Sequence, residues 1–254
     1  MVTESVTWWG HATTLLEIGG QRLLTDPLLR DRVGPLRWSG ERPPPGLARS
    51  VSAVLVSHLH RDHCDLPSLA GLPSGVAILA PAGAARLVPS DQRSRVHEMR
   101  PGDQLTLGGV AVEAVHAEHD GRRHPVGAAS PALGFVVRGR GSVFFAGDTD
   151  LHPAMADLRH AGIGLALLPV GGWGLTLGKG HLDATRAAEA LALIRPARAV
   201  PIHWGSLRVP GLWRLRPRMH TDPGSRFALH GSRTAPEVDI VVPGIGVPVG
   251  VPAP

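Results

Sequence analysis

A short histidine-rich segment offers the clearest chemistry in this chain of 254 residues. Four side chains that can bind a metal fall within the run His-Leu-His-Arg-Asp-His, which spans residues 58–63. His58 and His60 are two residues apart, so an extended or turning backbone can point both in the same direction. Asp62 and His63 come from the following turn, and their side chains are offset enough from those of His58 and His60 to reach a second ion. The spacing therefore predicts a metal site.

An apolar run directly precedes this segment and predicts how it is held. Val51–Ser57 has the length and composition of a buried strand. Rigid strand ends fix the loops that follow them, which is why chemistry often lies there. A polar loop that happens to be rich in histidine is the alternative interpretation. Burying that many polar side chains without a ligand would be costly, so we favour the metal site.

The cysteine content restricts the ligand types. Cys64 is the only cysteine, which excludes an internal disulfide framework and a zinc site built from thiolates. With 14 histidines in the chain, an ion would be bound by imidazole and carboxylate groups. Zinc is the default ion for these donors, and manganese and iron also suit mixed nitrogen and oxygen ligands. We expect Cys64 itself to be a small buried apolar residue.

Short strands with inserted helices are predicted around the histidine segment. Gln104–Leu107 pairs with Val110–Val115, and Leu133–Arg138 with Ser142–Ala146, as two hairpins with glycine-containing turns. Hairpins in each half, with helices between them, favour an α/β fold of two sheets packed face to face and covered outside by helices. No repeat or linker interrupts the chain, so one domain over residues 1–254 is expected. Further expected elements are helices at Pro81–Val88, Asp150–Ala161 and Asp183–Ile194, strands at Leu165–Val170, Arg198–Ile202 and Glu237–Val242, and an irregular loop over residues 30–50.

Five motifs in a fixed order extend over most of the chain, and they are Trp9–Glu17, Leu24–Pro27, Ser57–His63, Phe144–Thr149 and Pro201–Gly205. With this set the chain resembles the metallo-β-lactamase superfamily. Within it, the chain looks most like the hydrolases that include N-acylphosphatidylethanolamine phospholipase D and the ascorbate-6-phosphate lactonases. The resemblance implies a four-layer αββα sandwich, which agrees with the layers expected from the element order.

The resemblance also implies the rest of a two-metal site. Asp148 matches the carboxylate that bridges both ions in the family, and a bridging carboxylate offsets the repulsion of two dications roughly 3.5–4 Å apart. Taken alone, Asp148 would be a turn residue that caps the helix expected from Asp150. His203 matches the last histidine of the second ion. The implied ligands are His58, His60, His119 and Asp148 for one ion, and Asp62, His63, Asp148 and His203 for the other.

Two histidines compete for one ligand position. His116 and His119 both follow the expected strand Val110–Val115. The branch usually places this ligand after a small and a polar residue, with an arginine a few residues later. Ala117-Glu118-His119, followed by Arg122, fits that pattern better, so we assign His119 and leave His116 as the alternative.

Other polar residues near the motifs have less definite roles. His181 precedes a helix, as a histidine near the site does in the phospholipase-like members, where it would hold substrate or protonate a leaving group. An ordinary helix-terminal residue is the alternative. We expect His11 and Asp26 to be structural or to orient ligand histidines. Arg61 and Arg122 would contact an anionic substrate group or simply be solvated.

Together these features predict a metal-dependent hydrolase. Hydroxide bound between the two ions would attack a phosphodiester, with Asp62 and Asp148 holding ions and water and His181 assisting the leaving group. A lactone or sugar-phosphate ester is the alternative substrate. Two other classes stay open: a metal-dependent sensor or binding protein without turnover, and an iron-containing redox protein. Metal analysis and a substrate panel separate these possibilities.

Charge and composition bound the partners. The net charge is +5, but almost all positive charge is arginine, Lys179 is the only lysine and there is no tyrosine, so the high isoelectric point is weak evidence for nucleic-acid binding. A small anionic substrate fits better. The chain shows no secretory signal and no membrane span, so a cytoplasmic location is expected. Trp213–Arg218 alternates bulky and basic residues that could line an entrance or touch lipid headgroups. No feature predicts the oligomeric state.

Overall fold

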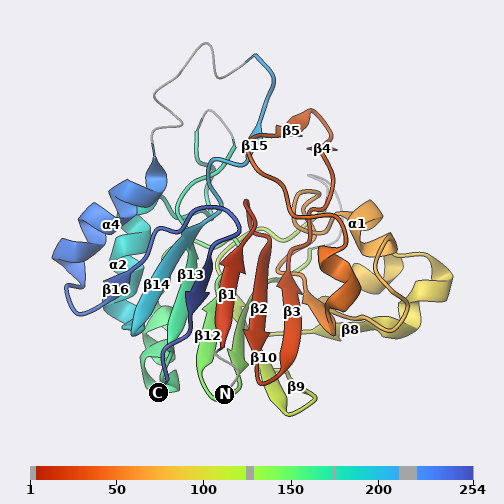
Figure 1. Ribbon diagram of the computed structural model, residues 1–254, viewed down its shortest axis with the longest axis horizontal. Coiled ribbons are helices and arrows are strands. Elements are labelled where there is room, and N and C mark those ends of the chain that lie inside the picture. Colours follow the sequence, from red (N-terminus) through yellow and green to blue (C-terminus); the bar gives the residue numbers. More distant parts are fainter. Residues whose placement is uncertain (1–3, 124–128, 174–175, 212–221, 254) are drawn as a thin grey trace.

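Two large sheets lie face to face in the computed structural model, which describes residues 4–123, 129–173, 176–211 and 222–253 (Figure 1). In the first sheet, strands β17 to β3 pair antiparallel, and strands β3 to β8 pair parallel. In spatial order its strands are β17 (Pro248–Gly250), β1 (Ser5–Trp8), β2 (Thr14–Ile18), β3 (Gln21–Thr25), β6 (Ala53–Leu55), β7 (Ala77–Pro81) and β8 (Val96–Met99).

The second sheet has the same mixture of parallel and antiparallel pairs. Its strands are β16 (Asp239–Ile240), β14 (Arg198–Ile202), β13 (Leu165–Pro169), β12 (Ser142–Phe145), β11 (Ala132–Arg138), β10 (Val110–Ala117) and β9 (Gln104–Leu107). A separate three-stranded sheet joins the two halves of the chain. It consists of β15 (Leu207–Arg208), β5 (Leu36–Trp38) and β4 (Arg32–Val33).

Helices cover the outer face of each sheet (Figure 1). The second sheet is covered by α2 (Ala184–Ile194), α4 (Pro223–Thr234) and the 3₁₀ helix η4 (Pro153–Ala161), whose buried residues share a cluster with that sheet. On the first sheet lie α1 (Leu66–Ala70) and the short 3₁₀ helices η1 (Leu47–Ser50) and η2 (Ala84–Arg86), and a third 3₁₀ helix, η3 (Ser90–Arg95), precedes β8 and buries none of its residues.

Strand β13 shows how the layers are built from the sequence. All five of its residues are buried, because the sheet is covered on both faces. Leu165 and Leu167 point into the core between the two sheets, and Ala166 and Leu168 pack against the helices. This alternation confirms the four-layer α/β sandwich expected from the sequence. It also explains why the strand reads as a continuous apolar run.

Helix α2 follows the predicted pattern closely. The side chain of Asp183 accepts hydrogen bonds from the backbone N–H groups of Thr185 and Arg186, which otherwise lack partners at a helix start. Ala187, Leu191 and other buried residues repeat at helical spacing on the covered face. The predicted helix Asp183–Ile194 is therefore confirmed, with Asp183 as its cap.

Two other predicted helices are wrong in kind or extent. Over Pro81–Val88 the chain forms the end of β7 and a three-residue 3₁₀ turn, because Gly83 has a φ of +98° that ends any helix there. Over Asp150–Ala161 the helix begins only at Pro153 and is a 3₁₀ helix. Residues 30–50 are more ordered than expected, since they contribute β4, β5 and η1.

Several elements were not anticipated from the sequence. Strands β8, β15 and β17 and helices α1 and α4 follow no strong pattern, and the predicted strand Glu237–Val242 shortens to two residues. The segment Trp213–Arg218, proposed above as an entrance or lipid contact, lies outside the described residues. None of the helices in the described part of the chain is long and apolar enough to cross a membrane.

Candidate metal centre

The predicted site residues meet at one edge of the two sheets. His58 to His63 follow β6, His119 follows β10, Asp148 follows β12 and His203 follows β14. The carboxyl ends of parallel strands share an edge, so loops that are far apart in the chain converge there. The histidine segment is a tight turn in which the backbone N–H groups of His63 and Cys64 both donate to the carbonyl of His60.

Three imidazole nitrogens form a first cluster. Nδ1 of His60 lies 2.9 Å from Nε2 of His58 and 3.2 Å from Nε2 of His119. The carbonyl of Gly180 can only accept, so Nδ1 of His119, at 2.8 Å, carries the proton. The Ser57 hydroxyl donates to Asp26 and therefore accepts from Nδ1 of His58. In the neutral rings, the inner nitrogens of His58 and His119 are thus unprotonated.

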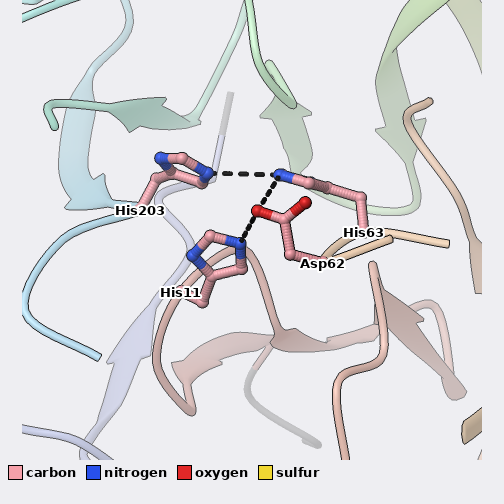
Figure 2. Close-up of side chains that lie close together, drawn as sticks. All are labelled: His11, Asp62, His63 and His203. Carbon is pink, nitrogen blue, oxygen red and sulfur yellow. Dashed lines mark hydrogen bonds and ion pairs between the residues drawn. The ribbon is translucent and has the colours of Figure 1, made fainter. Parts of the chain in front are cut away.

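A second cluster lies beside the first and contains Asp148. Nε2 of His63 is 3.2 Å from Nε2 of His203, and the two carboxylate oxygens of Asp148 lie 3.3 Å and 3.1 Å from these two nitrogens. Asp62 Oδ2 is 3.7 Å from the same nitrogen of His63. Figure 2 shows Asp62, His63 and His203 converging, together with His11.

The outer nitrogens of this second cluster are also fixed. Nδ1 of His63 donates to Asp26 at 2.7 Å, and Nδ1 of His203 donates to the carbonyl of Gly171 at 2.8 Å. Their Nε2 lone pairs therefore point at one another and at Asp148. The Oδ1 atom of Asp148 is buried and receives no hydrogen bond from the described residues. Lone pairs packed this closely are unfavourable unless a cation lies between them.

These separations fit a metal ion. Ligand atoms about 2.0–2.1 Å from a tetrahedral ion lie about 3.3 Å from each other. The contacts of both clusters fall between 2.9 and 3.7 Å. Among the described residues, four groups of side chains each bring potential ligand atoms within 4.8 Å of one another, and they are His58, His60 and His119; His11, Asp62, His63 and His203; Asp26, His58 and His63; and His119, Asp148 and His181.

Burial keeps most of these imidazoles neutral. Burial, reinforced by neighbouring histidines, lowers the pKa of His58 well below its ordinary value. The same causes lower the pKa of His60 to about 4 and, against the pull of Asp148, that of His203 to about 3. Neutral imidazole is the form that binds metal, so these side chains are ready to do so at neutral pH.

The carboxylates behave in the opposite way. Burial favours their protonated form, but the charge of neighbouring histidines holds the pKa of Asp62 and of Asp148 well below the usual range. Burial also opposes the charge on His63, yet the carboxylates of Asp148, Asp62 and Asp26 raise its pKa well above the ordinary value. The carboxylates around His63 therefore stabilise a positive charge there, either a proton on the imidazole or a metal ion.

Backbone conformations with positive φ position several of the candidate ligands. Gly147 has a φ of +62°, and a Cβ atom there would meet the Ser57 side chain at 2.5 Å. Only glycine allows the turn that places Asp148 beside the histidine segment. His11, Asp26 and His203 also have positive φ, with values of 50°, 33° and 65°. Strained residues gather at functional sites, and three of them touch this centre.

The competing histidine positions are separated by the strand end. His116 still belongs to β10, where its side chain is 49% exposed and lies 3.3 Å from Glu118. His119 lies beyond the strand and turns inward to His58 and His60. The structure therefore places His119, and not His116, in the first cluster. Cys64 is buried next to the loop, and burial raises its thiol pKa to about 12.

A cavity of about 740 Å³ opens onto both clusters. His181 faces it, with Nδ1 donating to the carbonyls of Gly178 and Lys179 and Nε2 lying 3.4 Å from Asp148. Burial opposes its charge, but Asp148 raises the pKa of His181 overall. Besides the clustered residues, the lining includes Arg61, Asp120, Arg122, Arg123, Lys179 and the apolar side chains of Val33, Pro35, Leu36, Trp173 and Leu177.

Two contacts of this site were not foreseen. Arg123 donates to the backbone carbonyls of Leu59 and Cys64, and these two hydrogen bonds stabilise the histidine segment. Trp173 donates from Nε1 to Asp62 at 3.0 Å. The glycine-rich stretch around Trp173 indicates a loop, but no local pattern tells which side chain the indole reaches. As expected, Asp26 orients a ligand candidate, since it accepts from His63.

Comparisons with known proteins place the chain in a family. The sequence model described as a beta-lactamase superfamily domain matches residues 21–204. A metal-dependent hydrolase from Opitutus terrae is 35% identical over 250 residues, covering 94% of this chain and 97% of that protein. A metallo hydrolase from Ignicoccus hospitalis has a similar structure, with a TM-score of 0.73 at 20% identity, covering 99% of each chain. A possible metal-dependent hydrolase from Veillonella parvula gives a TM-score of 0.75 at 18% identity, covering 98% of this chain and 100% of that one. The chain belongs to the metallo-β-lactamase superfamily.

Proposed function

We propose that this protein is a hydrolase with a dinuclear metal centre that cleaves a small anionic phosphodiester. The convergence of unprotonated imidazole nitrogens and a buried, unpartnered Asp148 oxygen carries this proposal. The similarity to the metal-dependent hydrolase of Opitutus terrae supports it. Zinc is the ion that this donor set favours.

The side chains divide into two sets that share one carboxylate. His58, His60 and His119 would hold one ion. Asp62, His63 and His203 would hold the other, and Asp148 lies within reach of both sets. Bound there, such ions supply Lewis acidity and a hydroxide nucleophile at neutral pH.

His181 is placed to handle the proton of the leaving group. Its Nδ1 atom is occupied by two backbone carbonyls, so Nε2 is the nitrogen that faces Asp148 and the cavity. The raised pKa means that the ring holds a second proton more readily than an ordinary histidine. A protonated Nε2 beside the reacting group can donate to the departing oxygen.

The charge of the cavity favours an anion. Four cationic side chains line it, but Arg122 is paired with Asp120 and Arg123 with backbone carbonyls. The side chains of Arg61 and Lys179 make no hydrogen bond or ion pair with any residue that the structure describes. They are exposed and free to meet a negatively charged group of the substrate.

The choice of phosphodiester rests on further support. The segments Phe144–Thr149 and Pro201–Gly205 resemble the phospholipase-like members of the family most closely. A phosphodiester carries one negative charge before it is attacked, which the cations of the cavity complement. A lactone is the competing substrate, and the test below includes it.

Substrate selection and metal dependence are tested together. We expect the zinc-loaded protein to hydrolyse bis(p-nitrophenyl) phosphate faster than any lactone in a panel, and to lose activity with a chelator. Asp148→Ala should lower kcat/KM roughly 10³-fold, because several kcal/mol of electrostatic stabilisation depends on the metal centre. Bound metal should fall below two ions per chain. The control Asp120→Ala removes a cavity carboxylate that is paired with Arg122 and belongs to neither cluster, and it should keep both ions.

The outcomes separate the alternatives. Preference for a lactone would replace the phosphodiester with a lactonase activity. Two bound ions without turnover of either substrate class would indicate a metal-dependent binding protein. An Asp148→Ala variant that keeps both ions and full turnover would contradict the proposed centre itself.

The metal-free protein should lose stability in mild acid. The pKa of four histidines of the two clusters is lowered from 6.5, so the unfolded chain binds more protons than the native one below that value. Stability is then present above pH 6.5 and is lost as the pH falls toward about 4, the pKa of His60, and about 3, that of His203. His63 and His181 act in the opposite direction but are fewer. The four histidines are His58, His60, His119 and His203.

Thermal unfolding in the presence of a chelator measures this effect. Each proton of net difference changes the free energy of unfolding by about 1.4 kcal/mol per pH unit. We expect the Tm of the metal-free protein at pH 5 to lie at least about 3 °C below that at pH 7. A Tm that is unchanged or higher at pH 5 would contradict the proposed protonation states.

The role of His181 is tested with two leaving groups. His181→Gln should reduce the rate at least about 100-fold for a diester that releases an alkoxide, because an alkoxide must be protonated as it leaves. With bis(p-nitrophenyl) phosphate the loss should stay below about tenfold, since p-nitrophenolate departs without a proton. Equal losses on both substrates would show that His181 only positions the substrate.

The two free cations are tested through KM. Lys179→Gln and Arg61→Gln should each raise KM about three- to tenfold for a diester with a second anionic group, with kcat unchanged, because they bind a part of the substrate that does not react. High salt should abolish the difference. Arg93→Gln removes the same charge outside the cavity and serves as the control. Equal KM values for all three variants would contradict this role.

A further inference from the structure

Asp62 is held by two side chains that come from distant parts of the chain. Its Oδ2 atom accepts from Nε2 of His11 at 3.1 Å and from Nε1 of Trp173 at 3.0 Å. His11 is 2% exposed and Asp62 is 9% exposed, so the contact between them is shielded from water. The Oδ1 atom of Asp62 receives no hydrogen bond from the described residues. Two donors thus fix Oδ2, the oxygen that also lies 3.7 Å from Nε2 of His63.

The hydrogen-bond partner of its ring separates His11 from the ligand histidines around it. Its ring lies 4.2 Å from that of His203 and 4.9 Å from that of His63, between centroids, within the second cluster (Figure 2). Nε2 faces a carboxylate, which can only accept, so this nitrogen carries a proton. The corresponding nitrogens of His63 and His203 point inward without one in the neutral rings. His11 is therefore a donor to a ligand candidate and not itself a ligand.

The backbone of His11 is fixed as firmly as its side chain. Its N–H group donates to the Ser206 hydroxyl at 2.8 Å, and its carbonyl accepts from Nε1 of Trp8 at 2.9 Å. The same carbonyl accepts from the backbone N–H of His203 at 2.8 Å. His11 thus contacts Asp62 with its ring and His203 with its backbone. A strained φ of 50° persists there because these contacts determine the conformation together.

We propose that His11 and Trp173 form a clamp on Asp62 that sets the occupancy of the second metal position. The proposal rests on the dinuclear centre proposed above. The clamp holds Asp62 against rotation, and His11 also ties His203 to the same place. None of these contacts reaches His58, His60 or His119, so the first position does not depend on the clamp. Trp173 is 38% exposed and lines the cavity, whereas His11 is enclosed.

Metal titration of the chelator-treated chain tests the clamp without any substrate. Wild type should bind two zinc ions. His11→Leu should weaken the second ion at least about tenfold and leave the first unchanged, since partners of metal ligands typically contribute 10- to 100-fold to affinity. His11→Gln should recover most of the loss, because its amide N–H can replace the Nε2 donor. Trp173→Phe should weaken the second ion by a smaller factor. His152→Leu is the matched control, since His152 is buried and its ring packs against His116, outside both clusters.

A double-mutant cycle shows whether His11 acts through Asp62. In an Asp62→Ala background, His11→Leu should cost little further affinity for the second ion, because the carboxylate it holds is gone. A full additional loss there would overturn the clamp, as would unchanged second-ion affinity in His11→Leu and Trp173→Phe.

A His11→Gln variant that binds the second ion no better than His11→Leu would show that His11 is itself a ligand. A wild-type chain that binds only one zinc ion would contradict the dinuclear centre itself. The number of ions bound by wild type is therefore measured before any variant is compared. Should His11→Leu fail to fold, Trp173→Phe carries the test alone.

Discussion

Mutual repulsion among buried lone pairs is the constraint on which the rest of this structure depends. Imidazole nitrogens of His58, His60 and His119 lie about as close together as hydrogen-bonded atoms, with too few protons to bond them all. The same holds where His63 and His203 face Asp148. Such an arrangement is unfavourable in itself, and the folded protein must hold it until a cation makes it favourable.

The fold meets this demand by occupying the outer nitrogens of the His63, His119 and His203 rings. Backbone carbonyls of Gly171 and Gly180 and the carboxylate of Asp26 accept from the outer nitrogens, which directs the free nitrogens inward. These acceptors stand on loops at the ends of buried strands, and the apolar core between the two sheets fixes those strands. The unfavourable geometry of the centre is therefore maintained by packing that does not itself depend on the metal.

How much of the fold and of the metal centre could be predicted from the sequence depends on how far apart in the sequence the contacting residues lie. The segment 58–63 and the turn at Asp148 are local patterns, so they could be located with their neighbouring strands. The choice between His116 and His119 required knowing where β10 ends, which strand patterning leaves uncertain by a few residues. The contacts that Asp62 makes with His11 and Trp173 span 51 and 111 residues, and no local pattern encodes them. The helix expected over Pro81–Val88 failed because the backbone conformation of Gly83 overrides helical propensity.

The substrate is the least predictable feature for a related physical reason. The metal ligands need one arrangement, because ion coordination tolerates little variation, and so their spacing forms a recognisable pattern. The cavity walls come instead from the β4–β5 hairpin, the loop after β10 and the segment before α2. Loops carry no periodic signal and tolerate many sequences, so their residues must be interpreted from position alone. Lys179 illustrates this: its type indicates only a positive charge, and its place beside His181 at the cavity gives that charge a role in recognising an anion.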